Sequence, residues 1–402
     1  MTTDTFDVVV VGGGPSGATA AHDLARKGRS ILLLDKAGRI KPCGGAIPPR
    51  LLRDFEVPVG LLVARITAAR MVSPADKEVD MPIDNGGFVG MVDRDVFDEF
   101  LRTRAAEAGA IRATGSFEAL SRDPDGTAVV EYRPKGAAAD APVQRARARL
   151  VIGADGARSQ VGKQAVPGAD KVKCVFAYHE IVEAPQGTEA AVPQYDSARC
   201  DVYYQGKLSP DFYAWIFPHG QTVSIGTGSM HKGFSLRGSV AELRKATGFD
   251  KMRTIRHEGA PIPLKPLRKW DNGKDVLLAG DAAGVVAPAS GEGIYYAMLG
   301  GRLAAEAAEA FCASGNPASL GLARARFMKQ HGRVFWILGV MQYFWYQNDR
   351  RREKFVKICE DRDVQRLTFE SYMNKELARK DPMAHVRIFL KDMAHLLGLA
   401  RT

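Results

Sequence analysis

The chain has 402 residues, 46% of them hydrophobic, and carries a formal net charge of +10. This length and composition predict a globular protein of two or three domains and exclude a fibrous or disordered chain. The basic charge is compatible with nucleic acid, an anionic membrane surface, an acidic substrate or a merely basic soluble protein. There is no nucleic-acid-binding motif, no expected metal site and no apolar run of the roughly 18 residues that span a membrane.

The five cysteines form no C-x-x-C pair, and their odd number argues against a disulfide framework. A reducing compartment therefore fits, and disulfide reductases are excluded. The first predicted strand begins almost at the N-terminus, which leaves no room for a secretory or transit peptide. We expect a cytoplasmic protein.

The first 35 residues predict a dinucleotide site. Residues 6–11 are apolar apart from Asp7, a pattern that is typical of a buried parallel strand. A G-x-G-x-x-G motif follows directly, formed by Gly12, Gly14 and Gly17. Its glycines allow a tight turn, close approach of a pyrophosphate and close helix packing, with Ser16 and the helix N-terminus beside the phosphates. Asp35 ends the second strand, where it suits ribose hydroxyls.

Two later segments repeat the pattern of an apolar strand that ends in glycine and aspartate. The first ends at Asp155-Gly156, and the second ends at Gly280-Asp281, before a helix that starts near Gly291 or Gly293. Such an aspartate can hydrogen-bond a sugar-like chain, and a glycine-rich helix start can stabilise negative charge on a reduced ring. Each segment alone could be an ordinary turn, but the three in this order favour FAD over NAD.

These segments resemble the para-hydroxybenzoate hydroxylase class of FAD proteins. The resemblance implies that the first motif holds the ADP part of FAD and that Asp281 holds the ribityl chain. It places Asp155 and Gly156 near the pyrophosphate and the path of the nicotinamide cofactor. It also implies that the helix start at Gly293-Ile294 lies by the flavin ring and that Arg94 contacts FAD.

The nicotinamide contact departs slightly from this class, because Lys163 stands near where the class has arginine. The sequence has no second G-x-G-x-x-G motif, so a dedicated nicotinamide domain is not expected. We therefore expect bound FAD and a reductant, NADPH by resemblance, that visits transiently.

Two further stretches resemble the geranylgeranyl reductases, in particular the bacterial, chlorophyll-type branch, up to about residue 310. The first is KPCGGAIPPRLLRDFEVP, residues 41–58, and the second is SPDFYAWIFPHGQTVSIGTG, residues 209–228. The resemblance implies reduction of the isolated double bonds of a geranylgeranyl chain to phytyl. It also implies a turn beside the flavin, formed by Cys43, Gly44, Gly45 and Ala46.

A prenyl chain is flexible and apolar, so its site is expected to be a long apolar slot. Its rigid wall is predicted to consist of Tyr213, Trp215, Phe217 and Pro218. Gly226 and Gly228 would let the chain pass close to the backbone. The alternative is a core strand with alternating aromatic residues.

An isolated alkene has no carbonyl to accept charge, so a proton must reach one carbon while a hydride reaches the other. Cys43 is a candidate proton donor because a thiol is mostly protonated at neutral pH. The alternative is a packed cysteine that only shapes the turn. Tyr213 and His219 are weaker candidates, and His219 follows a proline and could be exposed.

The C-terminal part joins an apolar, aromatic stretch at 334–346 to the basic cluster Arg350-Arg351-Arg352. This pattern suits an interfacial helix on anionic lipid or, equally, a core helix with a solvated basic end. Residues 385–402 show the same ambiguity. Because a prenylated tetrapyrrole resides in membranes, we expect peripheral contact with an intracellular photosynthetic membrane.

The predicted fold is α/β: a Rossmann-type FAD domain (1–75, 94–165 and 270–320) interleaved with an antiparallel sheet domain (76–93 and 166–269), plus a C-terminal helical region (321–402). The predicted reaction is FAD-dependent, NADPH-driven reduction of three double bonds on geranylgeranyl-(bacterio)chlorophyll or geranylgeranyl diphosphate. The alternatives are a reductase of another prenyl lipid, a flavin monooxygenase on the same fold, and a non-catalytic prenyl-pigment carrier.

Overall fold

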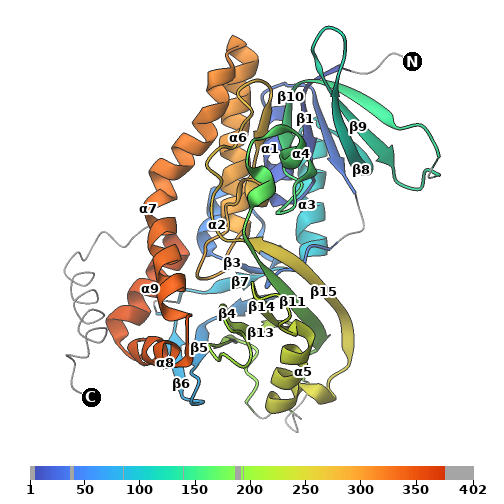
Figure 1. The fold of residues 1–402 in the computed structure, drawn as a ribbon. Helices are drawn as coiled ribbons and strands as arrows, with labels where there is room; N and C mark the ends of the chain where they lie inside the picture. The colour runs from blue at the N-terminus through green and yellow to red at the C-terminus, as the bar shows by residue number, and fades with distance from the viewer. Residues whose placement is uncertain are drawn as a thin grey trace. The chain divides into compact units, whose positions relative to one another are not determined.

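The computed structural model describes residues 5–36, 40–84, 86–138, 140–185, 192 and 194–375 (Figure 1). The chain divides into two compact units, each assembled from three segments. Unit 1 comprises Met1–Lys41, Arg94–Cys174 and Pro261–Gly339. Unit 2 comprises Pro42–Asp93, Val175–Ala260 and Val340–Thr402. The predicted amphipathic stretch at 385–402 lies outside the described residues.

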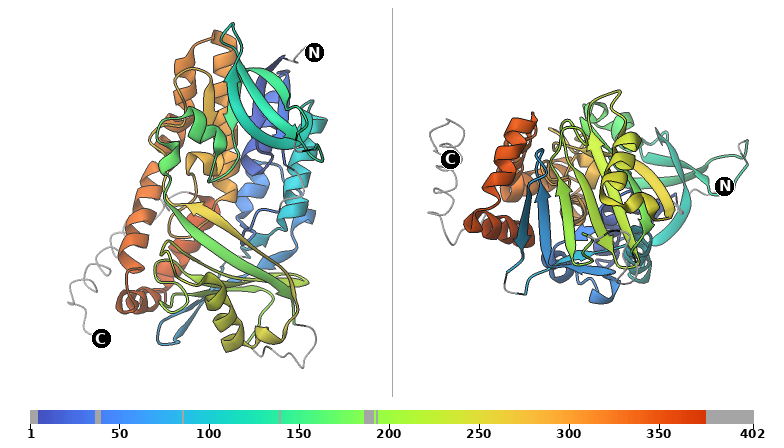
Figure 2. Two further views of the ribbon diagram at one scale, coloured as in Figure 1. Left: turned by 45° about the vertical axis from the view of Figure 1, so that its right-hand side comes forward. Right: turned by 90° about the horizontal axis from the view of Figure 1, so that it is seen from below.

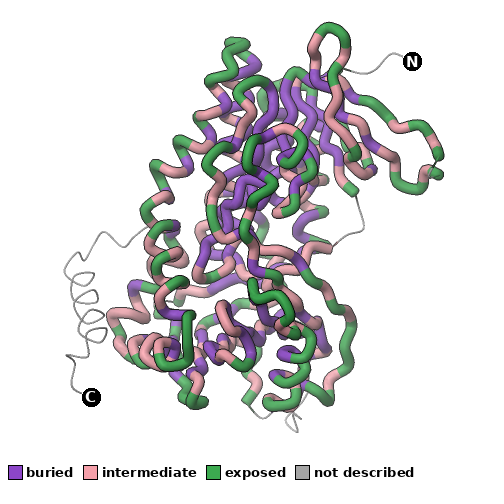
Figure 3. The backbone as a smooth tube through the Cα atoms, in the orientation of Figure 1, coloured by how far each residue is buried: buried purple, intermediate pink, exposed green. Residues whose placement is uncertain are grey.

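Unit 1 is built on a six-stranded sheet, in which the parallel strands run in the order β8-β2-β1-β10-β16 and an antiparallel strand, β9, bridges β8 and β10. The strands are β1 (Thr5–Val11), β2 (Ile31–Asp35), β8 (Ile111–Arg122), β9 (Ala128–Pro134), β10 (Gln144–Gly153) and β16 (Val276–Leu278). The apolar runs of β1 and β10 are buried, as Figure 3 shows, because helices cover a parallel sheet on its faces.

The helices of unit 1 are α1 (Pro15–Ala25), α3 (Arg94–Glu107), α4 (Gln160–Ala165), α6 (Ile294–Ser314) and α7 (Gly321–Trp345), the last of which crosses the unit boundary. Helix α1 packs against α3 and α6 (Figure 1). A Cβ atom on Gly301 of α6 would lie 2.1 Å from the carbonyl oxygen of Ser16, so glycine lets these helices approach closely.

Unit 2 is built on a seven-stranded sheet of order β15-β11-β14-β13-β12-β5-β6 and a small sheet of order β3-β7-β4 (Figure 2). The large sheet contains β5 (Ala68–Val72), β6 (Glu78–Pro82), β11 (Cys174–Glu183), β12 (Arg199–Tyr203), β13 (Ala214–His219), β14 (Thr222–Ser229) and β15 (Thr254–Pro263). The small sheet contains β3 (Ala46–Ile47), β4 (Ala64–Ile66) and β7 (Val89–Met91). Helix α5 (Leu236–Thr247) covers one face of the large sheet, where Val240 and Leu243 pack with Ile216 and Ile225.

Three short helices complete unit 2: α2 (Pro49–Asp54), α8 (Asp349–Ile358) and α9 (Arg362–Asn374). Helix α9 packs Phe369, Tyr372 and Met373 against a buried cluster that includes Ile66 and Met91. The described residues of the predicted C-terminal region from 340 onwards therefore belong to unit 2, and α9 packs against its core.

The predicted α/β fold is confirmed, but the domain boundaries differ from those expected. Residues 42–75 fall in unit 2 because β5 pairs with β12 of the large sheet. Residues 166–174 and 261–269 fall in unit 1. Strand pairing between distant segments determines these boundaries, and the local sequence pattern does not report it.

Candidate functional site

The G-x-G-x-x-G motif of unit 1 forms the turn between β1 and α1. A Cβ atom on Gly12, whose φ is +108°, would lie 2.3 Å from the carbonyl oxygen of Ala154. On Gly17 it would lie 1.8 Å from the carbonyl oxygen of Gly12. On Gly14 it would meet no atom within 4 Å. The first and third glycines therefore serve packing, whereas the second faces open space that another group can approach.

The start of α1 offers donors for a phosphate. No side chain caps the helix, and the buried Oγ of Ser16 has no hydrogen-bond partner among the described residues. A helix N-terminus with free N–H groups favours an anion. The carboxylate of Asp35 accepts a 2.8 Å hydrogen bond from Gly13 N at the end of β2, as expected for the ribose position. These residues fit a dinucleotide such as FAD.

The Gly280-Asp281 segment follows β16 as a short 3-10 helix in unit 1. Asp281 is 7% exposed and forms an ion pair with Lys41, a partner that the sequence did not indicate. A Cβ atom on Gly293, which precedes α6, would lie 3.9 Å from Asp281 Oδ1. Gly280 and Gly291 have φ values of +63° and +64°, and Ile294 is buried as the first residue of α6. The structure thus places Asp281, the predicted contact of the ribityl chain, close to Gly293, which is predicted to lie by the flavin ring.

Asp155, another predicted cofactor residue, has hydrogen-bond partners within unit 1. The carboxylate of Asp155 accepts hydrogen bonds from the Ser159 hydroxyl and from the backbone N–H groups of Gln160 and Val161, at the start of α4. Burial raises the pKa of Asp155, although these donors oppose the effect. Gly156 has a φ of +89° and open space beside it. The FAD and nicotinamide contacts of this pair remain predictions.

Arg94 begins α3, and its guanidinium forms two 2.8 Å hydrogen bonds to the carboxylate of Asp98, one turn later. Both side chains are buried. Arg94 is therefore held in place by its own helix, and its contact with FAD remains a prediction.

The aromatic segment of unit 2 places alternate residues on one face of β13, opposite α5. The rings of Tyr213 and Trp215 lie 6.0 Å apart between centroids, and so do those of Trp215 and Phe217. His219 follows at the next position of the same face, and Pro218 is buried within the strand. Tyr213 and Trp215 are 8% and 6% exposed. We call these four side chains, Tyr213, Trp215, Phe217 and His219, the aromatic row.

Gly226 and Gly228 lie beside the protein's own side chains. Trp215 is directly opposite Gly226 on β14, and a Cβ atom on Gly226 would lie 2.2 Å from Cζ2 of the indole. A Cβ atom on Gly228 would lie 2.7 Å from Val175 Cγ1 and 3.0 Å from Phe212 Cδ1. The structure therefore gives these glycines a packing role that the sequence interpretation did not include, since their predicted role was to admit the prenyl chain.

A chain of hydrogen bonds orients Trp215 in unit 2. The indole N–H donates to Ser224 Oγ at 3.2 Å, and Ser224 Oγ lies 3.0 Å from His179 Nδ1. His179 Nε2 lies 2.8 Å from Glu258 Oε2. Because a carboxylate only accepts, His179 donates from Nε2 to Glu258. The sequence interpretation missed these residues, since their contact depends on the register of β11, β13, β14 and β15.

The three candidate proton donors all lie in unit 2. Cys43 is half-buried, and its Sγ accepts a 3.4 Å hydrogen bond from Gly45 N in the turn before β3. Burial raises the pKa of Tyr213, and the nearby ionisable groups of Tyr346 and Cys43 add to this effect. Tyr213 is therefore a neutral phenol near Cys43. His219 is 6% exposed, so the expectation that it could be exposed is wrong.

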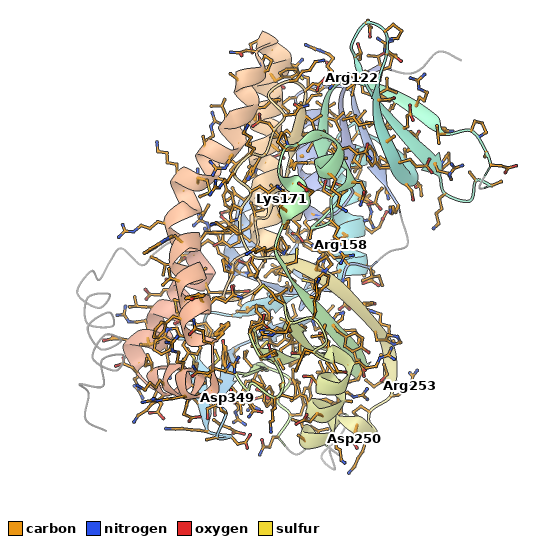
Figure 4. All side chains as sticks on the ribbon, viewed as in Figure 1. Arg122, Arg158, Lys171, Asp250, Arg253 and Asp349 are labelled. Atoms are coloured by element: carbon orange, nitrogen blue, oxygen red, sulfur yellow. The ribbon has the colours of Figure 1, made fainter. Side chains whose placement is uncertain are left out.

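The basic cluster at 350–352 is divided between solvent and core. Arg350 is exposed, and the Arg351 guanidinium lies 4.2 Å from the ring centroid of Phe344. Arg352 is 2% exposed, donates to the carbonyl oxygens of Pro210 and Tyr346, and pairs with Asp349, which Figure 4 labels. The alternative of a core helix with a solvated basic end therefore fails at Arg352, which hydrogen-bonds to the start of the aromatic segment.

Helix α7 carries an exposed apolar face along one side. Trp336, Val340 and Tyr343 are 69%, 47% and 76% exposed and are spaced by four and three residues. Among the described residues, no helix has the length and apolarity needed to cross a bilayer. The same residues contain no cluster of three or more potential metal ligands, and all five cysteines are free thiols.

Comparisons with known proteins identify the class to which these features belong. A family model described as an FAD binding domain matches residues 63–305, and one described as an NAD(P)-binding Rossmann-like domain matches residues 10–65. The chain is 59% identical to geranylgeranyl diphosphate reductase of Rhodobacter capsulatus over 98% of both chains. It is 35% identical to the chloroplastic geranylgeranyl diphosphate reductase of Oryza sativa, over 97% of this chain and 86% of the relative.

A solved structure shows the same fold. The geranylgeranyl bacteriochlorophyll reductase-like protein of Thermoplasma acidophilum superposes with a TM-score of 0.82 at 23% identity, over 96% of this chain and 99% of the other. The similarity therefore extends past residue 310, where the recognisable sequence motifs end.

Proposed function

The chain belongs to the geranylgeranyl diphosphate reductase family, and from this premise we propose that it saturates a geranylgeranyl chain attached to a tetrapyrrole pigment. The family and the FAD-dependent reduction of a geranylgeranyl chain rest on one observation above the others, the 59% identity over 98% of both chains. NADPH is the reductant. The attachment to a pigment is the part that remains to be tested.

Each round of the reaction adds one proton and one hydride across a carbon–carbon double bond and converts NADPH to NADP⁺. FAD, when bound, supplies the hydride. The glycine turn, Ser16 and Asp35 would hold its nucleotide end, and Asp281 its ribityl chain. Three rounds convert geranylgeranyl to phytyl.

The aromatic row is suited to hold the apolar chain. Its rings are rigid and bury large apolar areas at a low cost in conformational entropy. The same surface excludes water from the alkene, which protects a carbon that becomes electron-poor during proton transfer. Tyr213 and Cys43 both carry exchangeable protons beside the row, and we propose Cys43 as the proton donor.

The test is a mass spectrum of the prenyl product after anaerobic incubation of the purified protein with NADPH. Geranylgeranyl-bacteriochlorophyll in detergent and geranylgeranyl diphosphate are offered in separate reactions. Mass gains of about two units per round, ending after three rounds on the pigment, support the proposal. Reduction of the diphosphate alone would contradict the pigment assignment, and reduction of neither would contradict the reductase activity. A requirement for dioxygen would indicate a monooxygenase.

We also propose that the protein works at the surface of an intracellular photosynthetic membrane. The apolar face of α7 supports this, because exposed Lys329 and Arg333 precede Trp336 on the same side of the helix. Aromatic residues beside basic residues suit an anionic lipid surface.

The membrane proposal is tested by flotation with vesicles. The wild-type protein should float with vesicles that contain anionic phosphatidylglycerol, and a Trp336→Ser/Tyr343→Ser variant should lose most of this binding. Ile255→Ser is the matched control, since Ile255 is an exposed apolar residue of β15, 44% exposed. Equal flotation of all three proteins would contradict the proposal.

A further inference from the structure

His219, the last residue of the aromatic row, has hydrogen bonds at both ring nitrogens. Nδ1 lies 3.0 Å from Asp93 Oδ1, in the segment after β7. Nε2 lies 3.0 Å from the carbonyl oxygen of Gly44. The ring therefore connects β13 to two other segments of unit 2, and one of them is the turn that carries Cys43.

This turn, residues 43–45, lies in close contact with the aromatic row. Gly45 has a φ of +72°, and a Cβ atom on it would lie 2.5 Å from His219 Cε1. A Cβ atom on Gly44 would lie 3.0 Å from the ring of Phe217. Val92 N donates to the carbonyl oxygen of Gly45 at 3.0 Å. The two glycines let the turn lie against the last two side chains of the row.

The hydrogen-bond partners of His219 indicate which of its ring nitrogens donate. A backbone carbonyl only accepts, so Nε2 of His219 donates to Gly44. An ionised carboxylate also only accepts, so the contact with Asp93 requires a proton on Nδ1 or on the carboxyl group. Because both nitrogens are engaged, the ring has no free N–H to offer a substrate.

We propose that His219, oriented by Asp93, is a positioning residue that holds residues 43–45, and with them the Cys43 thiol, against the end of the aromatic row. The catalytic consequence rests on the proposed function, but the positioning itself does not. His219 thereby changes from a candidate proton donor to the residue that places one.

The titratable neighbours of the ring are few. Asp93 is the charged side chain that bonds to it, and Cys43 belongs to the turn beneath it. Strand β4 contributes Arg65, whose guanidinium lies over Phe88, 5.0 Å from the ring centroid. Asp93 is therefore the charged group whose removal should release the His219 ring.

The test measures how fast iodoacetamide alkylates Cys43 in the folded, FAD-loaded protein. Cys174 is the internal reference, since it is the other half-buried thiol and the remaining three are buried. His219→Phe keeps the ring but removes both hydrogen bonds, and the Cys43-to-Cys174 rate ratio should rise about tenfold, as the loss of one hydrogen bond predicts. His219→Gln retains a donor for Gly44 and should return the ratio to within about twofold of wild type.

A matched control and a charge variant complete the experiment. His179→Phe removes another buried histidine that is bonded to a carboxylate in the same sheet, and should leave the ratio within about twofold. Asp93→Ala removes the partner of Nδ1, so its ratio should rise in the same direction as that of His219→Phe. Melting curves and FAD absorbance identify any variant that fails to fold.

Three outcomes would overturn the proposal: an unchanged ratio in folded His219→Phe, a His219→Gln variant as reactive as His219→Phe, or an unchanged ratio in folded Asp93→Ala. None of these readouts needs a prenyl substrate or turnover. A failure of the positioning role is therefore distinguishable from a failure of the proposed function.

Discussion

Gly226 is the position at which a single added methyl group tests the arrangement of the aromatic row. In Gly226→Ala, the new Cβ would lie 2.2 Å from Cζ2 of Trp215 and 2.7 Å from Cβ of His179. Ordinary carbon contacts are about 3.5–4.0 Å, so the indole has to move by about 1.5 Å. The hydrogen bond from the indole to Ser224 is 3.2 Å long and does not survive this movement.

The expected loss of stability in Gly226→Ala has two contributions. Overpacking a tight site costs about 1–3 kcal/mol, and leaving the buried indole N–H without a partner costs about 1–3 kcal/mol. Together they predict a loss of about 2–6 kcal/mol in the free energy of unfolding. A moved indole also changes the wall of the row, so the reaction should stop more often at partly reduced chains.

Calorimetry measures the first effect, and mass spectra of the prenyl products measure the second. Gly259→Ala is the control, because Gly259 is also in the large sheet but its added Cβ would have one neighbour, the carbonyl oxygen of Ala177 at 3.1 Å. We expect this control to lie within about 1 kcal/mol of wild type. If Gly226→Ala also unfolds within about 0.5 kcal/mol of wild type, the packing argument is refuted.

Three other variants probe the remaining features. Gly17→Ala, whose Cβ would lie 1.8 Å from a carbonyl oxygen, should yield protein without the absorbance of bound FAD. Arg352→Met removes the donor from two buried carbonyl groups, and chemical denaturation should show a loss of about 2–4 kcal/mol. For Glu258, burial acts to raise the pKa, but the hydrogen bonds and charges of His179 and Arg256 together outweigh it and lower the pKa. Its stabilisation is therefore complete above its unfolded pKa of about 4.3 and is lost as the pH falls through the folded value. Glu258→Gln should flatten this acid-side loss of urea resistance, and an unchanged slope would contradict the assignment.

Features that depend on local sequence were predictable here. The strand, the glycine turn and the helix at residues 5–25 fold together, so the spacing of Gly12, Gly14 and Gly17 specifies their geometry. The burial of Tyr213 and Trp215 was also predictable, because clustered aromatic residues on one strand rarely remain exposed. The burial of His219 was not.

Features that depend on strand register were not predictable. Nothing near Gly226 in the sequence shows that the Trp215 ring lies across it, because this requires the pairing of β13 with β14. The position of β5 beside β12 and the contact of Arg352 with Pro210 likewise join residues more than a hundred positions apart. In each case the local composition is compatible with more than one structure. The basic cluster at 350–352, for example, suits either an interfacial helix or a core helix with a solvated end.

The contact between α8 and the aromatic segment has a consequence for biosynthesis. Tyr204, next to Tyr213, packs against Tyr346 and Phe355 at centroid distances of 5.4 and 4.9 Å, and Arg352 bonds to Pro210. The ribosome makes residues 204–217 well over a hundred residues before these partners. During that interval the nascent chain carries a large apolar surface without its cover, which makes it prone to aggregate. Chaperone demand should therefore peak late in translation and end when α8 emerges.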